Sequence, residues 1–214
     1  MPPVDILEEL QREPDRSTPV LRAIRRKYSK SFALAPAASV FQAAGRILDT
    51  RDPSLRFVAY ELVHHHPAAR ASLRKTTVER LGRGMTSWGE VDAFGYYISG
   101  PAWCDGGITD AAILAWTVSA DRWWRRAALV STIAMTRRGD KASLNRSVRV
   151  CTRLVRDWDD MIVKALSWAL REIARRDAAC ARRFLQEHRV HLARRVTREV
   201  TNKIMTGLKN PRRR

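Results

Sequence analysis

The sequence contains few of the residues from which a disulfide framework or a cysteine-based zinc site is built. Only three cysteines occur, Cys104, Cys151 and Cys180, and they lie far apart with no C-x-x-C pair. This number and spacing exclude a disulfide-rich scaffold and a zinc site of that kind. We therefore expect reduced, buried cysteines, and neither a bound metal nor a cofactor.

Long apolar runs are also lacking. The segment AAILAWTVSA, at 111–120, is about half of the roughly 20 residues that a membrane-spanning helix needs. The first residues, MPPVDILEEL, are acidic and lack the basic and apolar regions of a secretory signal. We expect a soluble, cytoplasmic protein without a membrane partner.

Acidic residues are scarce relative to basic ones. The chain has 40 Lys and Arg against 22 Asp and Glu, which gives a formal net charge of +18. Such an excess attracts polyanions, so nucleic acid is the first candidate partner and a ribosomal or membrane surface the second. The charge is uneven, because residues 180–214 hold eleven Lys or Arg and only two Glu.

The sequence also lacks the alternation of apolar and polar residues that predicts a β-strand. Its apolar residues recur with a helical period nearly everywhere. Residues 64–66, three adjacent histidines, precede Pro67 and predict a helix end rather than a metal site. Residues 1–208 are expected to form one all-α domain, and residues 209–214 a mobile basic tail. The expected helices span residues 4–13, 19–31, 36–48, 53–65, 76–81, 86–99, 110–116, 120–136, 141–156, 160–175, 178–187 and 190–208, with breaks at 82–84, 100–101 and 138–139.

A weak internal repeat predicts how these helices are organised. One polar residue followed by an apolar or small triplet recurs at intervals of 36, 34 and 38 residues, beginning at Arg56, Asp92, Arg126 and Lys164. Helix pairs of this period stack into a curved α-solenoid whose equivalent helices line one concave surface. We expect a basic concave face, with the four polar residues in a row on it.

Helical spacing places two tryptophans beside charged residues. Trp88 and Asp92 are i and i+4 on one face, and Lys164, Trp168 and Arg171 are i, i+4 and i+7 on another. A helical tryptophan is more often part of the core, and a lone aspartate is usually a surface group. These two tryptophans differ because each shares its face with charge.

The segment 120–136 also combines arginine with tryptophan. Arg122 and Arg126 share a face beside Trp123 and Trp124. Trp103, Trp116 and Trp158 are assigned to the core.

The segments SWGEVDAFG, DRWWRRAALVST and IVKALSWALREIARRD occur in this order and carry a family resemblance. Together they resemble the AlkD-like DNA alkylation repair enzymes, which are alkylpurine DNA glycosylases built from HEAT-like helical repeats. The resemblance runs from about residue 20 to residue 189. The chain departs from the family pattern at Ser87 and at Gly89-Glu90, where relatives often have a second aromatic residue and an acid.

The resemblance implies roles for particular residues. The family's catalytic aspartate falls on Asp92, and its two tryptophans fall on Trp88 and Trp168. Its phosphate-binding arginines fall on Arg126 and Arg171. We expect Lys164, Arg122 and Arg125 to add to the DNA contact.

The chemistry explains why one carboxylate is enough. Hydrolysis of an N-glycosidic bond normally needs an acid for the leaving base and a carboxylate for the sugar cation. A purine alkylated at N3 or N7 already carries positive charge and leaves as a neutral base, so it dispenses with the acid. We expect a monomeric glycosylase that acts on such purines in duplex DNA, without complete base extrusion according to the resemblance.

Two other functions are compatible with the same residues. A solenoid that binds branched or damaged DNA without catalysis keeps the basic face and makes Asp92 irrelevant. A protein or RNA scaffold uses the charge for structured RNA. Substitution of Asp92 separates the first from an enzyme, and competition between methylated duplex DNA and structured RNA separates the second.

Overall fold

The described part of the chain folds into helices joined by turns and irregular connections. The computed structural model describes residues 5–211, and no β-strand occurs within that range. The chain divides into two compact units, Met1–Ile108 and Thr109–Arg214. The prediction of an all-α protein is confirmed.

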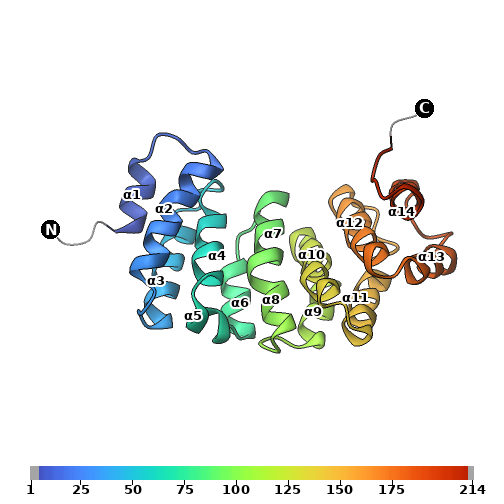
Figure 1. Ribbon diagram of the computed structural model, residues 1–214, viewed down its shortest axis with the longest axis horizontal. Helices are drawn as coiled ribbons and strands as arrows, with labels where there is room; N and C mark the ends of the chain where they lie inside the picture. The colour runs from blue at the N-terminus through green and yellow to red at the C-terminus, as the bar shows by residue number, and fades with distance from the viewer. Residues whose placement is uncertain (1–4, 212–214) are drawn as a thin grey trace. The chain divides into compact units, whose positions relative to one another are not determined.

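The first unit is built of helix pairs, and the second helix of one pair packs on the second helix of the following pair. Helix α2 packs on α4, and α4 packs on α7, while α1 and α3 contact their partners α2 and α4 (Figure 1). The helices are α1 (Ile6–Arg12), α2 (Thr18–Ser31), α3 (Ala37–Asp49), α4 (Arg56–His64), α5 (Pro67–Ala71), α6 (Lys75–Gly82), α7 (Trp88–Phe94) and α8 (Gly100–Cys104), with a π-helix, η1 (Gly95–Ser99), between the last two.

The predicted break at residues 100–101 is wrong, because α7, η1 and α8 follow one another without interruption. Pro101 has no N–H group, so the carbonyl four residues earlier, that of Tyr97, loses its helical donor. The Nδ1–H group of His64 donates to this carbonyl at 3.0 Å instead. The wide π turn and the histidine together let the helix pass through the proline.

The second unit has the same plan and is more regular. Helices α10, α12 and α14 pack successively on one another, and α9, α11 and α13 each pack on the helix that follows. The helices are α9 (Asp110–Trp116), α10 (Arg122–Arg138), α11 (Lys141–Arg153), α12 (Asp160–Arg176), α13 (Ala178–Glu187) and α14 (Arg194–Thr206). In α12 the core stripe of Ile162, Leu166, Leu170 and Ile173 has the 3.6-residue period that predicted the helix.

Most predicted helix boundaries agree with the structure to within a few residues. Helix α4 ends at His64, as the three histidines predicted, and His66 then caps α5 through its ring nitrogen. The short α5 was not predicted. Helix α14 begins at Arg194 rather than at Val190, whose side chain is 82% exposed.

The assignment of tryptophans and cysteines to the core is correct only in part. Trp103 and Trp116 are buried as expected, but Trp158 is 65% exposed because it lies in the irregular segment between α11 and α12 rather than on a helix that faces the core. Cys151 is buried, whereas Cys104 and Cys180 are only partly buried; all three are free thiols.

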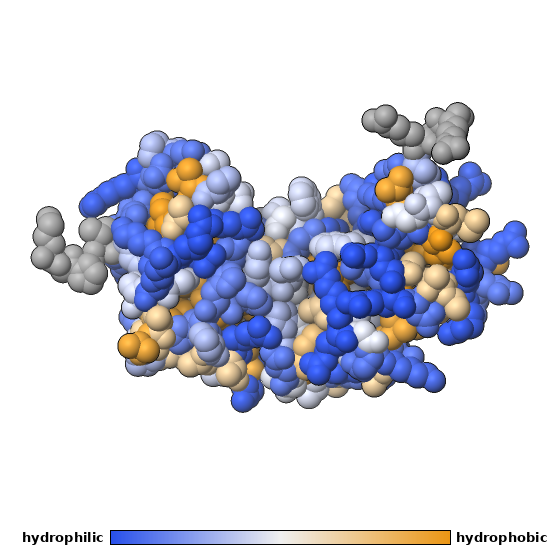
Figure 2. Space-filling model, viewed as in Figure 1, coloured by the Kyte–Doolittle hydropathy of each residue, from blue (hydrophilic) through white to orange (hydrophobic). Residues whose placement is uncertain are grey.

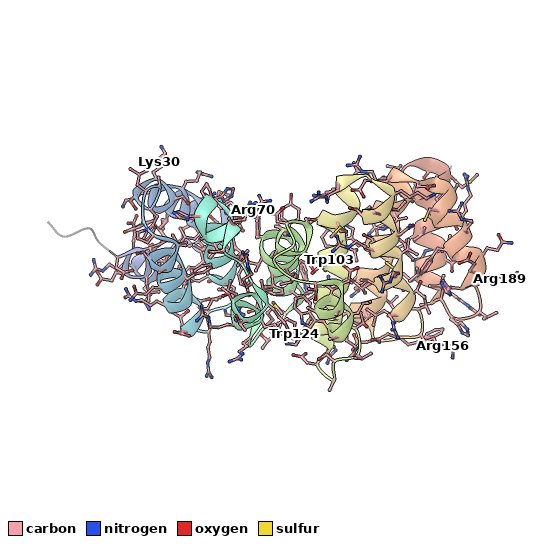
Figure 3. The ribbon with its side chains drawn as sticks, turned by 90° about the horizontal axis from the view of Figure 1, so that it is seen from below. Lys30, Arg70, Trp103, Trp124, Arg156 and Arg189 are labelled. Atoms are coloured by element: carbon pink, nitrogen blue, oxygen red, sulfur yellow. The ribbon has the colours of Figure 1, made fainter. Side chains whose placement is uncertain are left out.

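The surface of each unit is mainly hydrophilic. Figure 2 shows polar side chains over most of the visible face of each unit, with isolated apolar residues among them. Arg156 and Arg189 are exposed on the second unit (Figure 3). At the C-terminus, Lys209 lies 3.6 Å from Glu199, and residues 212–214 of the predicted tail lie outside the described range. None of the described helices is long and apolar enough to cross a membrane.

Candidate active site

The first turn of α7 is fixed by a complete capping box. The Ser87 hydroxyl accepts from the Glu90 N–H group, while a Glu90 carboxylate oxygen accepts from the N–H groups of Ser87 at 2.9 Å and Thr86 at 2.5 Å. The other Glu90 oxygen lies 3.7 Å from Nε of the buried Arg56. Glu90 therefore has a structural role here, satisfying the free N–H groups at the start of the helix.

The cap places Trp88 and Asp92 one turn apart on a rigid helix end. Trp88 is 61% exposed, although a large apolar side chain normally gains by burial. Asp92 is half-buried. The π-helix η1 begins three residues after Asp92, and π turns are frequent at functional sites. The structure thus keeps the predicted aromatic and carboxylate neighbours at the surface of the first unit.

A buried carboxylate that the sequence did not predict supports η1 and α4. Glu61 is 1% exposed and accepts from Nε of Arg22 at 2.7 Å and from Nε of Arg25 at 3.2 Å. Arg22 also donates to the Tyr97 hydroxyl at 3.3 Å. Burial raises the pKa of Tyr97, and the neighbouring Glu61 raises it further. This network joins α2, α4 and η1 in the first unit.

The three predicted arginines of α10 differ in what they can bind. Arg125 is held by Asp157, which accepts from its Nε at 2.7 Å, and by the carbonyls of Ser119 and Ala120. Arg126 is 5% exposed and donates to the Met161 carbonyl at 2.6 Å. Arg122 is exposed and lies 3.3 Å from Asp159. Arg122 is therefore the arginine of this set whose side chain is open to solvent.

The expected surface row of four aligned polar residues is wrong at two positions. Arg56 and Arg126 are buried, at 6% and 5% exposure. Each turns inward because it finds acceptors there: Arg56 donates to the carbonyl of Arg83 and to the Tyr60 hydroxyl, and Arg126 donates to Met161. The repeat correctly aligned equivalent helices, but it did not distinguish inward from outward side chains.

Helix α12 keeps the second predicted cluster together. Lys164, Trp168 and Arg171 are all partly exposed on its length, as the i, i+4, i+7 spacing requires. Lys164 lies 2.6 Å from Asp160, an ion pair within the helix. Burial lowers the pKa of Arg171, whose Nε donates to the Ser167 hydroxyl at 3.4 Å.

A second unpredicted carboxylate, Glu199, lies beneath this cluster on α14. It is 2% exposed and accepts from the Ser167 hydroxyl at 2.6 Å and from Nε of Arg195 at 3.0 Å. Burial acts to raise its pKa, but the hydrogen bonds from Ser167 and Arg195 outweigh this and hold the pKa below the ordinary value. In the sequence, Glu199 stands between Val196 and Val200, which are both fully buried, and this position on an apolar stripe was the signal that could have predicted its burial.

The described side chains form no evident metal site. Within residues 5–211, no group of three or more His, Cys, Asp or Glu side chains is placed to hold a metal ion. What the two units do offer is an aromatic residue and a carboxylate on α7, and an aromatic residue between two cations on α12.

Comparison with known proteins identifies a family for the chain. A model of the family described as DNA alkylation repair enzyme matches residues 16–204. No curated protein and no solved structure gives a match. The match spans most of the 214 residues and both units, and the stacked helix pairs agree with the helical-repeat solenoid of that family. The chain belongs to the DNA alkylation repair enzyme family.

Proposed function

We propose that the protein is a DNA glycosylase that releases purines alkylated at N3 or N7 from duplex DNA. The observation that carries this proposal is the start of α7, where an exposed Trp88 and a half-buried Asp92 stand one turn apart on a helix end held by Glu90. An apolar ring left in solvent on a rigid element is suited to contact a ligand. Membership of a family of alkylation repair enzymes supports DNA as that ligand.

In the proposed reaction, the bond between the sugar C1′ and the base nitrogen breaks, and its electron pair goes to the base. The positive charge of the alkylated purine is thereby neutralised, so no proton donor is needed. The sugar becomes an oxocarbenium ion, which the Asp92 carboxylate stabilises while it positions the attacking water. As the water oxygen bonds to C1′, its proton passes to the Asp92 carboxylate, which then releases it to solvent and returns to its charged form. Trp88 lies against the cationic nucleotide, where an indole face contributes about 0.5–2 kcal/mol.

The second unit is proposed to bind the DNA strand. Lys164, Arg171 and Arg122 carry the positive charge that phosphate attracts, and arginine binds phosphate bidentately. Trp168, between Lys164 and Arg171 in sequence, supplies an aromatic contact to the DNA. The buried Arg126 supports the unit through Met161 in the described conformation, and its predicted phosphate contact requires the side chain to turn outward.

Incubation with methylated duplex DNA tests the proposed function directly. We expect free N7-methylguanine and N3-methyladenine in the supernatant, and no release of 8-oxoguanine, because an uncharged base needs the acid that the proposed mechanism lacks. Chromatography of the released bases measures both. Comparable release of 8-oxoguanine, or release of no methylpurine, would show that the proposal is wrong.

Replacing Trp88 with alanine is expected to lower the excision rate without destabilising the fold. Loss of the indole contact corresponds to about a 2- to 30-fold decrease, since about 1.4 kcal/mol is tenfold in rate. Because the side chain is exposed, the free energy of unfolding is expected to change by no more than about 0.5 kcal/mol. Trp158→Ala, another exposed tryptophan, is the control, and an equal loss of rate in both variants contradicts the role of Trp88.

A further inference from the structure

A cavity in the first unit lies outside the residues assigned to the reaction. It has a volume of about 800 Å³ and is lined by the α3–α4 connection, by α6 and by the α6–α7 connection. Four arginines line it, Arg51, Arg56, Arg80 and Arg83, against two carboxylates, Asp49 and Glu90. Glu90 is already satisfied by Arg56 and by backbone N–H groups, so the cavity carries an excess of positive charge.

Three of these arginines have no anionic partner in the described part of the chain. Arg51, Arg80 and Arg83 are exposed, and no carboxylate among residues 5–211 forms an ion pair with them. Other arginines of this unit are paired, for example Arg22 with Glu61, Arg46 with Asp5 and Arg70 with Asp105. Like charges around one cavity repel one another unless an anion lies between them. The cluster therefore suits an external anion.

Arg51 adds an independent observation from the backbone. Its φ angle is +56°, and among the described residues it is the one position other than glycine with a positive φ. Arg51 follows Thr50, the cap of α3, and adopts the left-handed backbone conformation that Gly139 and Gly207 adopt as the caps of α10 and α14. Backbone strain of this kind clusters at functional sites, so it marks Arg51 as a candidate functional position.

We propose that Arg51, Arg80 and Arg83 form a second binding site, which holds a phosphate group of the DNA backbone. This inference rests on the proposed function, because that function supplies DNA as the ligand. Guanidinium groups bind a phosphodiester through paired hydrogen bonds, and three of them around one cavity accommodate a single phosphate or two adjacent ones. The site contributes to affinity and to the position of the duplex, and it takes no part in cleavage of the glycosidic bond.

Arg51→Gly separates binding from stability, because the two are expected to change in opposite directions. Glycine relieves the unfavourable backbone conformation, so the thermal midpoint rises by about 2–4 °C. Loss of the guanidinium lowers affinity for unmodified duplex DNA about 5- to 10-fold, and it reduces the slope of log K against log salt by about 1. Arg80→Gln and Arg83→Gln lower affinity similarly. The excision rate at saturating DNA is unchanged in all three.

Lys30→Gln is the matched control. Lys30 is an exposed cation in the last turn of α2, in the same unit (Figure 3), and it forms no described ion pair. The inference is overturned if Arg51→Gly binds DNA as tightly as Lys30→Gln does. It is also overturned if Arg51 binds inorganic phosphate but not DNA. In that case millimolar phosphate raises the thermal midpoint of the unaltered protein and not that of Arg51→Gly, while the two proteins bind DNA equally. If the unaltered protein releases methylpurines but these variants bind normally, only this inference fails; if it releases none, the proposed function fails first.

Discussion

Replacing Asp92 with asparagine is expected to reduce the release of N7-methylguanine by at least about 100-fold, the scale of losing one group that stabilises transition-state charge. Asparagine has nearly the same shape, so the capped start of α7 stays in place. Its amide carries no negative charge and cannot stabilise the oxocarbenium ion. Affinity for duplex DNA is expected to hold or rise, because a negative charge is removed from a surface that binds phosphates. Single-turnover excision and equilibrium binding measure the two effects.

Asp105→Asn provides the control for the change in net charge. Asp105 is an exposed carboxylate of the same unit, paired with Arg70 at 2.9 Å, and surface pairs of this kind contribute about 0–1 kcal/mol. This variant is expected to keep its excision rate. If Asp92→Asn releases methylpurine as fast as Asp105→Asn does, the protein acts on DNA without this carboxylate. The proposed catalytic role of Asp92 is then wrong. A non-catalytic, DNA-binding role becomes the better account only if the unaltered protein releases no methylpurine.

The sequence predicted the helices well wherever the apolar period alone determines them. Helix α12 is an example, because its buried stripe recurs every three or four residues and its ends carry Asp159 and Asp177 as caps. The prediction failed at residues 100–101, where a glycine and a proline normally end a helix. The helix continues there because His64, more than thirty residues earlier in the chain, satisfies the free Tyr97 carbonyl. A contact of this kind cannot be deduced from local sequence.

The candidate site shows the same division between local and distant causes. The spacing of Trp88 and Asp92 and the order of residues in α12 were readable, because both follow from helix geometry. The inward turn of Arg126 was not, because it depends on an acceptor supplied by another segment. The capping role of Glu90 is local, whereas its approach to Arg56 depends on a distant segment. Buried Glu61 and Glu199 escaped notice for a related reason. A glutamate in a helix usually lies at the surface.

Replacing Glu199 with glutamine is expected to destabilise the second unit by about 3 kcal/mol, near the lower limit for removing one partner of a buried ion pair. Its carboxylate holds Arg195 and Lys209 and accepts from the Ser167 hydroxyl. Without it, these cations repel one another around a buried amide. The effect stays at the low end because Arg195 and Lys209 are 36% and 40% exposed, so solvent screens part of the charge.

The dependence of this effect on pH identifies its origin. Because the folded state holds the pKa of Glu199 below its ordinary value of 4.5, the stabilisation is fully present above that value and is lost as the pH falls through the folded pKa. The difference in stability between the unaltered protein and Glu199→Gln is therefore expected to be constant near neutrality and to shrink below about pH 4.5. Denaturant unfolding across this range measures it.

Glu187→Gln, an exposed position on α13, is expected to change stability by less than about 0.5 kcal/mol at any pH. A Glu199→Gln protein as stable as this control at pH 7 contradicts the role of the carboxylate in joining α12 to α14.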